Sequence, residues 1–269
     1  PMQTILIATA VVAVIGFIIG LALVAAGKKF AVKVDERVEA IRSLLPGNNC
    51  GACGFAGCDA MAAAIVDGNT PVNSCPVCSA DKVAAMAEIM GVNAEATVRK
   101  VAFVHCAGSC EKSPETFHYV GVRDCRTAVL SGVPARACSS GCLGFGSCVA
   151  ACPHNAIQVQ NGVAVVLPGR CLGCGLCAAA CPKNLISLIP VGSANGVRCS
   201  SHERGPAVKK VCSAGCLGCG LCVKQCPEGA VSLQNNLAVI DPEKCIGCGK
   251  CAEKCPAGSI VPASPALRA

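Results

Sequence analysis

The sequence has no tryptophan, one tyrosine and only six phenylalanines among its 269 residues. This scarcity excludes an ordinary globular enzyme whose core is built on aromatic side chains. Charged residues are also few, at 14%, while 53% of the residues are hydrophobic, which excludes a disordered chain. Cysteine, by contrast, occurs 26 times. So many cysteines indicate either disulfides in a secreted protein or metal sites in a reducing compartment.

The N-terminal segment favours the reducing compartment. Residues 5–26 contain no charge and no proline, and as a helix they would span about 33 Å, enough to cross a bilayer. Lys28 and Lys29 follow directly, so the positive-inside rule puts the rest of the chain in the cytoplasm. The sequence therefore predicts a single-pass transmembrane anchor in the cell (inner) membrane at residues 1–27, rather than a cleaved signal peptide. Cytoplasmic cysteines would then bind metal instead of forming disulfides.

The segment after the anchor divides into three parts. Residues 28–46 are expected to form a stalk helix, with Val38, Ile41 and Leu45 on one face. Residues 47–92 form a compact unit with the spacing C-x2-C-x4-C-x16-C and two helices, at about 59–66 and 80–90. Its cysteines, Cys50, Cys53, Cys58 and Cys75, are candidates for an iron–sulfur cluster, with a four-cysteine zinc site as the alternative. Residues 93–135 are an irregular connector.

The rest of the chain is an internal repeat. Eight cysteines recur 74 residues further on, and within each copy a second offset of 29 relates two halves. The repeat defines module 1 at residues 136–190, a linker at 191–207, module 2 at 208–262 and a tail at 263–269. The repeated cysteines of module 1 and their partners in module 2 are Cys138, Cys142, Cys148, Cys152, Cys171, Cys174, Cys177, Cys181 and Cys212, Cys216, Cys222, Cys226, Cys245, Cys248, Cys251, Cys255.

Each half of a module carries the run C-x2-C-x2-C-x3-C-P or a variant of it, which is typical of bacterial ferredoxins. In such a run three cysteines bind one [4Fe–4S] cluster and the fourth binds a neighbouring cluster. The segments between the runs alternate around Asn161-Gly162 and around Asn235-Asn236, which predicts a β-hairpin in each module. The predicted fold is therefore α+β: a transmembrane helix, a small four-cysteine iron–sulfur domain and two tandem bacterial-type 2[4Fe–4S] ferredoxin domains.

The crossed ligand pattern assigns three complete sites in the two modules. They are Cys216, Cys219, Cys222 with Cys255; Cys245, Cys248, Cys251 with Cys226; and Cys171, Cys174, Cys177 with Cys152. The fourth site keeps only Cys142, Cys148 and Cys181, because Phe145 stands where the repeat requires cysteine. Cys138 is the obvious substitute, although Cys212 occupies the same place in the intact module.

With the four-cysteine unit, these sites predict five clusters. A sixth could form through Cys106, Cys110 and Cys125, with Cys138 or Cys78 as its fourth ligand. Cys199 stands alone in the linker and is expected to be a free thiol.

The formal charge of +7 does not indicate a nucleic-acid partner, because five clusters with four thiolates each, at about −2 apiece, would bring it to about −3. No nucleophile elbow, phosphate loop or nicotinamide-binding fingerprint is present. The chain is therefore expected to carry electrons without a catalytic site of its own.

Taken together, the apolar N-terminus, the unit NNCGACGFAGC, the stretch HCAGSC and the opening GCLGFGSC resemble the RnfB family over nearly the whole chain. Members of that family are subunits of the Rnf complex, a membrane ferredoxin:NAD oxidoreductase that couples electron flow to ion pumping. The resemblance implies that Cys138, Cys142, Cys148 and Cys152 form one ligand set, which differs from the crossed pairing.

The resemblance also implies a role. Such a subunit takes electrons from soluble ferredoxin at the cytoplasmic face and passes them reversibly to membrane partners, while other subunits bind flavin and NAD. Two other hypotheses are a polyferredoxin arm of another membrane redox complex, such as a hydrogenase, and a zinc-stabilised interaction scaffold. The expected partners are soluble ferredoxin, the other subunits and membrane lipid, and no nucleic acid.

Overall fold

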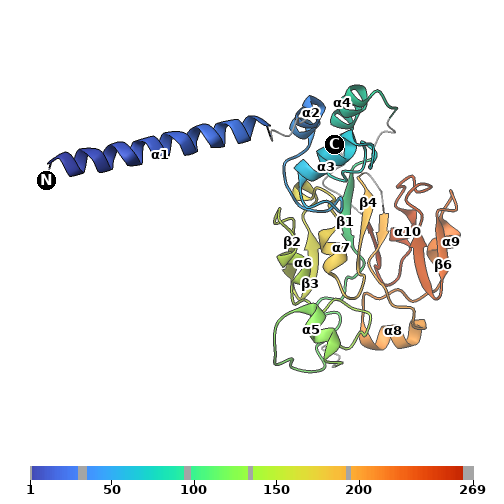
Figure 1. Cartoon of the computed structure of the whole chain (residues 1–269). Helices are drawn as coiled ribbons and strands as arrows, with labels where there is room; N and C mark the ends of the chain where they lie inside the picture. The colour runs from blue at the N-terminus through green and yellow to red at the C-terminus, as the bar shows by residue number, and fades with distance from the viewer. Residues whose placement is uncertain (1, 30–34, 94–97, 133–135, 192–194, 263–269) are drawn as a thin grey trace.

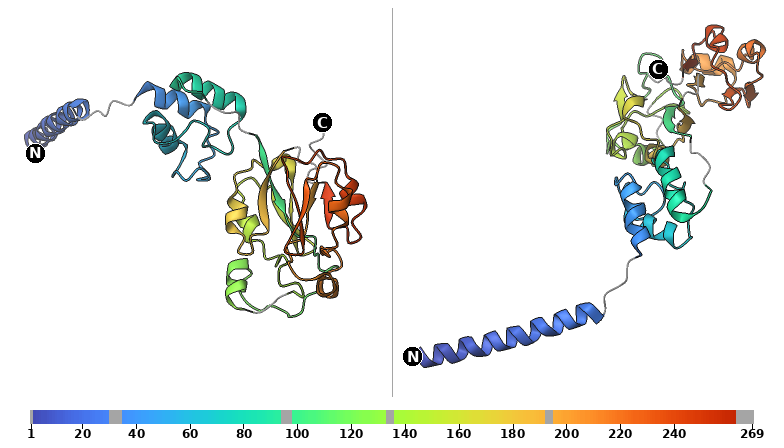
Figure 2. Two further views of the ribbon diagram at one scale, coloured as in Figure 1. Left: turned by 90° about the vertical axis from the view of Figure 1, so that its right-hand side faces the viewer. Right: turned by 90° about the horizontal axis from the view of Figure 1, so that it is seen from above.

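The computed structural model describes residues 2–29, 35–93, 98–132, 136–191 and 195–262. One long helix, α1 (Met2–Lys29), projects from a body made of three cysteine-rich units (Figures 1 and 2). The predicted tail and residues 30–34 of the predicted stalk lie outside the described residues.

Helix α1 exposes large apolar side chains, among them Phe17, Ile18, Leu23 and Val24. Among the residues described, no helix has both the length and the hydropathy that a membrane crossing requires. This finding differs from the transmembrane anchor predicted for residues 1–27.

The unit next to α1 consists of α2 (Glu36–Leu44), α3 (Cys58–Val66) and α4 (Ala80–Met90). The Asp35 carboxylate caps α2 by accepting a hydrogen bond from the Arg37 amide at 2.9 Å. Ile41 from α2 is fully buried among side chains of α3 and α4, including Met61, Ile65 and Met86. The two helices predicted for residues 47–92 are thereby confirmed.

The first ferredoxin-like unit begins earlier than the repeat suggests. Its elements are β1 (Lys100–Val104), α5 (Cys125–Leu130), α6 (Ser147–Ala150), β2 (Ile157–Gln160), β3 (Val163–Val166), the 3-10 turn η1 (Pro168–Arg170), α7 (Leu176–Ala180) and β4 (Ile186–Pro190). Strand β1 pairs antiparallel with β4, from Lys100 opposite Pro190 to Val104 opposite Ile186. The predicted connector therefore supplies the first strand of this unit. The run from 101 to 104 is buried throughout and lacks the alternation that would have revealed a strand.

The second unit repeats this plan. It contains β5 (Asn195–Val197), α8 (Gly205–Val211), α9 (Leu221–Gln225), β6 (Val231–Gln234), β7 (Leu237–Ile240), α10 (Lys250–Glu253) and β8 (Ile260–Pro262). Strand β5 lies in the predicted linker and pairs antiparallel with β8. Here too the first strand of the unit precedes the repeat found in the sequence.

Both predicted hairpins are confirmed, as β2–β3 and β6–β7. Asn161 and Gly162 have φ values of 45° and 74°, and Asn235 and Asn236 have 48° and 64°. Two successive positive φ values are what the tight turn of a hairpin requires, and asparagine and glycine adopt them most readily.

Glycine is required at a recurring place in the cysteine loops. A Cβ atom on Gly144, Gly173 or Gly218 would lie 2.6, 2.2 or 2.7 Å from a backbone carbonyl oxygen, and all three residues have positive φ. Because backbone cannot move aside as a flexible side chain can, these loops pack directly against the hairpin turns or against β1.

Candidate metal centres

The four repeated loops hold their cysteines in the same way. A glycine in the left-handed conformation precedes each of the short helices α6, α7, α9 and α10. Each helix then buries the third cysteine of its run; these are Cys148, Cys177, Cys222 and Cys251.

The cysteine before each proline is fixed by a backbone hydrogen bond. Its sulfur accepts from the amide four residues later, at 3.2–3.5 Å. These cysteines are Cys152, Cys181, Cys226 and Cys255, with donors Ala156, Leu185, Ala230 and Ser259. Amide donors of this kind stabilise thiolate ligands and tune a cluster.

In the second unit, one cavity is lined by Cys216, Cys219, Cys222 and Cys255. Burial raises the pKa of Cys222 to about 11, and the neighbouring Cys216 and Cys219 contribute to the rise. The structure thus brings together the four cysteines of one crossed set.

The other two complete sets follow the same pattern. Burial raises the pKa of Cys177 to about 11, with further contributions from Cys171, Cys174 and Cys152. Burial likewise raises the pKa of Cys251, and the neighbouring Cys245 and Cys248 add to the rise. Cys226 packs against the same core.

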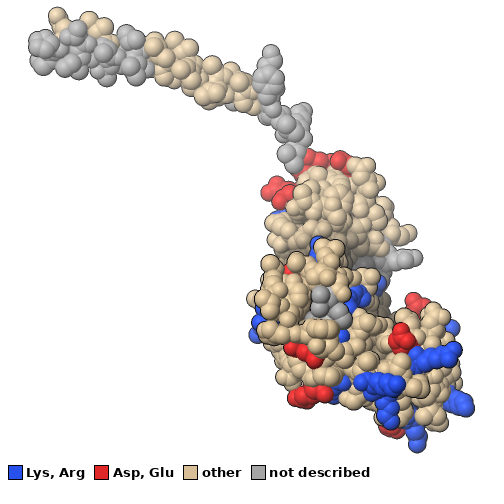
Figure 3. Space-filling model, turned by 90° about the horizontal axis from the view of Figure 1, so that it is seen from below, with Lys and Arg blue, Asp and Glu red and all other residues tan. Residues whose placement is uncertain are grey.

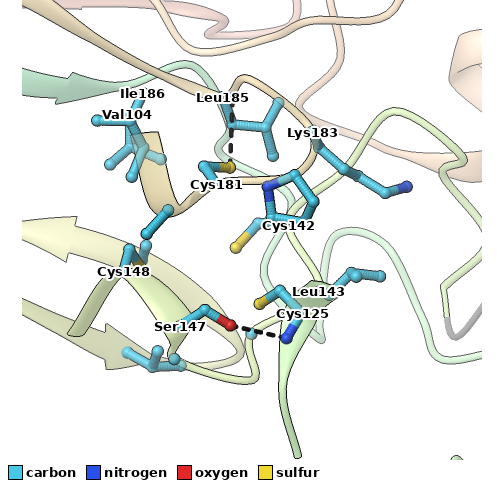
Figure 4. Close-up of a pocket in the computed structure, with 16 residues that line it drawn as sticks. Val104, Cys125, Cys142, Leu143, Ser147, Cys148, Cys181, Lys183, Leu185 and Ile186 are labelled. Carbon is cyan, nitrogen blue, oxygen red and sulfur yellow. Dashed lines mark hydrogen bonds between the residues drawn. The ribbon is translucent and has the colours of Figure 1, made fainter. Parts of the chain in front are cut away.

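The site with Phe145 gains its fourth cysteine from the connector. One cavity is lined by Cys125, Cys142, Cys148 and Cys181 (Figure 4). Burial raises the pKa of Cys148 to about 12, and Cys142, Cys125 and Cys181 add to the rise. The predicted substitute, Cys138, does not line this cavity.

Cys125 is held in place by a cap at the start of α5. The Asp124 carboxylate accepts hydrogen bonds from the Thr127 amide at 2.9 Å and from the Ser147 hydroxyl at 2.7 Å. The Ser147 oxygen in turn accepts from the Cys125 amide at 2.7 Å. Ser147 precedes Cys148, so the cap ties the connector to the cysteine loop of module 1.

A further cavity is lined by Cys106, Cys138, Cys199 and Cys212. Burial raises the pKa of Cys138, and the neighbouring Cys212, Cys106 and Cys199 add to the rise. This set, which we call the bridging set, draws on the connector, on module 1, on the linker and on module 2.

The bridging set differs from three expectations. Cys199 is buried and lies with three other cysteines, so it is not the isolated thiol that its linker position suggested. Cys138 lines this cavity and not that of the Phe145 site, which differs from the predicted substitution and from the set implied by the resemblance. Cys106, Cys110 and Cys125 do not form one group, because two of them line different cavities and Cys110 is exposed. One sequence signal was available: Cys138 and Cys212 are repeat partners that both lie outside the ferredoxin runs.

The N-terminal unit contains the remaining set, Cys50, Cys53, Cys58 and Cys75. Burial raises the pKa of Cys75, and the neighbouring Cys53 and Cys50 add to the rise. The Asn49 side chain accepts a hydrogen bond from the Cys58 amide at 2.8 Å, which links the start of α3 to the loop. Two cysteines, Cys78 and Cys110, stand outside all six sets.

The thiol sets suit a four-iron cube. Within the described residues no group of three His, Cys, Asp or Glu side chains is placed to hold a single metal ion. The four cysteines of three sets line a common cavity, and backbone amides donate hydrogen bonds to sulfurs of these sets. Four thiolates around such a space match the Cys₄ ligation of [4Fe–4S] clusters.

Comparison with known proteins agrees with these sites. Residues 45–77 match a family described as "Putative Fe-S cluster". Residues 137–185, 170–230 and 215–259 match the 4Fe-4S dicluster domain. The chain is 42% identical over 90% of its length to the B component of the Na⁺-translocating ferredoxin:NAD⁺ oxidoreductase complex of Acetobacterium woodii, and covers 73% of that protein.

The chain belongs to the RnfB family. It is 45% identical over 89% of its length to the B component of the proton-translocating ferredoxin:NAD⁺ oxidoreductase complex of Clostridium ljungdahlii, and covers 85% of that protein. It is 40% identical over 87% of its length to the B component of the ion-translocating oxidoreductase complex of Methanosarcina acetivorans, and covers 89% of it. This RnfB protein is therefore an iron–sulfur electron-transfer subunit of a membrane-associated, multi-subunit ion-translocating complex.

Proposed function

We propose that six [4Fe–4S] clusters, one in each cysteine set, form a single conduit through this subunit. The conduit would carry electrons from reduced ferredoxin to the membrane partners of the complex, and would work in both directions. The observation that carries the proposal is the neighbour relationship between successive sets. Each bound cluster would supply one-electron redox chemistry, while the protein sets the order and spacing.

The first three sets adjoin one another in order. Burial raises the pKa of Cys174, and the electrostatic interaction with Cys50 of the N-terminal unit adds to the rise. The set of Cys174 also interacts with the Phe145 site, since Cys177 adds to the rise in the pKa of Cys148.

The bridging set continues this series of neighbouring cysteine sets between the two modules. On one side the Cys142 amide donates a hydrogen bond to the Cys106 sulfur at 3.4 Å. On the other side burial raises the pKa of Cys199, while a backbone hydrogen bond from Cys216 lowers it. The first bond joins the bridging set to the Phe145 site, and the second joins it to module 2.

Module 2 is the proposed input end. Among the cysteines of the six sets, only Cys219 and Cys248 are exposed, and both belong to this module. Lysine and arginine side chains gather at the end of the molecule opposite α1 (Figure 3). In module 2, Lys209, Lys210 and Lys224 are exposed. A cationic surface attracts an acidic electron donor such as a ferredoxin.

The N-terminal unit, next to α1, is the proposed output end. The exposed apolar side chains of α1 would attach the protein to the membrane, with the cysteine-rich units on the cytoplasmic side. Flavin and NAD would then be bound by other subunits, and this chain would contact them only as an electron carrier.

The test is anaerobic mixing of the fully loaded, full-length protein with reduced ferredoxin, without flavin or NAD. Bleaching of the visible absorbance should show uptake of about six electrons per chain. A Cys222→Ala variant should take up fewer. No uptake by wild-type protein with its full iron content would refute the proposal.

The hydrogenase-arm hypothesis is not retained, because the chain matches RnfB relatives over about nine-tenths of its length. The zinc scaffold is disfavoured by the iron–sulfur families that match both parts of the chain.

A further inference from the structure

The bridging set differs in charge from the two other sets whose four cysteines line a described cavity. Two arginines, Arg136 and Arg198, line its cavity. The cavity of the Cys216 set has no charged residue in its wall, and that of the Phe145 site has one, Lys183, whose ammonium group donates to the Ser139 carbonyl.

Arg136 is unusually buried for an arginine, with 3% of its surface exposed. Its guanidinium donates to the Gly108 carbonyl at 2.7 Å, to the Gly162 carbonyl at 2.9 Å and to the Cys110 sulfur at 3.2 Å. Its Nε has no hydrogen-bond partner in the part of the chain that the structure describes. A buried charge usually has a partner of opposite sign, because removing it from water is costly.

No carboxylate provides that partner among the described residues. The three ion pairs of the described chain involve Arg37, Arg42 and Lys244. Glu115 meets Arg136 only through a backbone bridge. Arg198 is half-buried and donates to the Cys106 carbonyl at 3.0 Å, so both guanidiniums are directed to neutral carbonyls or a thiol.

We infer that Arg136, assisted by Arg198, is paired with the negative charge of the cluster in the bridging set and raises its reduction potential above those of the neighbouring clusters. This inference rests on the proposed function, because it needs a cluster in that set. A [4Fe–4S] cluster with four thiolates is a dianion when oxidised and gains a further negative charge on reduction. A fixed cation in a poorly solvated site therefore stabilises the reduced form more than the oxidised form.

Because of its position, the higher reduction potential of the bridging set affects electron transfer between the modules. The set joins the two modules, so an electron arriving through module 2 would reside there preferentially. Arg136 thus helps to set how electrons are distributed between the clusters of the two modules.

The test is a redox titration of the full-length Arg136→Gln protein, followed by electron paramagnetic resonance after iron and sulfide have been counted. At a fixed ambient potential, the reduced-to-oxidised ratio of one cluster should fall about tenfold, equivalent to about 59 mV for a one-electron couple. Arg136→Lys keeps the charge and should restore much of the ratio. Arg37→Gln removes an exposed arginine of α2 and should leave the reduction potential of every cluster unchanged.

Retention of all iron with every potential unchanged in Arg136→Gln would overturn the inference. If Arg136→Gln loses the cluster, Arg198→Gln becomes the deciding variant: it should lower the potential of the same cluster, and no change would overturn the inference. A wild-type protein with about 20 iron atoms would instead refute the sixth cluster itself, and hence the proposed conduit.

Discussion

Replacing Cys199 by serine should remove one cluster and leave the other five. Cys199 is 8% exposed, and its sulfur accepts hydrogen bonds from the Ser201 amide at 3.5 Å and from the Cys216 backbone. These donors would stabilise a thiolate ligand, and a serine hydroxyl is a poor replacement for one. Since six sets of four cysteines predict about 24 iron atoms, the variant should retain about 20.

The assay is iron and acid-labile sulfide per chain on anaerobically purified protein, followed by electron uptake from reduced ferredoxin. Because the bridging set lies between the modules, loss of its cluster should slow reduction of the module 1 clusters while those of module 2 are still reduced rapidly. Cys110→Ser is the matched control, since this exposed cysteine belongs to no set, and it should retain all iron. A Cys199→Ser protein with undiminished iron and unchanged kinetics would refute the ligand assignment.

Three further outcomes are expected. Cys125→Ser should lose about four iron atoms. Adding Phe145→Cys to that variant should restore them, because it recreates the ligand of the intact repeat. If iron analysis shows no recovery in the double variant, this site assignment is contradicted. Gly173→Ala should lower the free energy of unfolding, measured by anaerobic denaturant unfolding, by about 1–3 kcal/mol more than Gly249→Ala does. Both glycines have positive φ, but only a Cβ on residue 173 would lie 2.2 Å from a carbonyl oxygen. Equal losses in the two variants would contradict the packing argument. Burial lowers the pKa of His105, so the stability that its neutral form contributes is present above about pH 6.5 and is lost as the pH falls. The midpoint of thermal unfolding should therefore drop on acidification. His105→Gln should weaken this dependence of the midpoint on pH.

The geometry around His105 explains why its neutral form is favoured. Its Nδ1 lies 2.9 Å from the Val197 carbonyl oxygen, which can only accept, so Nδ1 carries the proton. Its Nε2, 2.7 Å from the Ser187 oxygen, then accepts from that hydroxyl. Protonation of Nε2 would turn this acceptor into a donor and add charge at a half-buried site between β4 and β5.

Local spacing was enough to predict the repeated parts of the structure. The runs with fixed cysteine intervals fold as tight loops capped by left-handed glycines, and the asparagine-rich turns fold as hairpins, because each depends on a few adjacent residues. The helices of the N-terminal unit were predictable from the periodicity of apolar residues such as Ile41 and from caps such as Gly91.

The members of the bridging set could not be predicted from the intervals between cysteines in the sequence. Cys106 and Cys199 are separated by 93 positions and belong to segments without a regular pattern, and only the pairing of β1 with β4 and of β5 with β8 brings those segments between the modules. The fourth cysteine of the Phe145 site was missed for the same reason, since Cys125 reaches that site through a cap that joins two distant segments. Tertiary contacts, rather than local motifs, decide both cases.

The most direct test of the six-site assignment is the iron, sulfide and zinc content of the wild-type protein purified without oxygen. The six cysteine sets predict about 24 iron atoms and about 24 sulfides per chain, with no stoichiometric zinc. About 20 iron atoms would contradict the bridging set as a cluster site, and stoichiometric zinc with little iron would contradict electron transfer as the function of this chain.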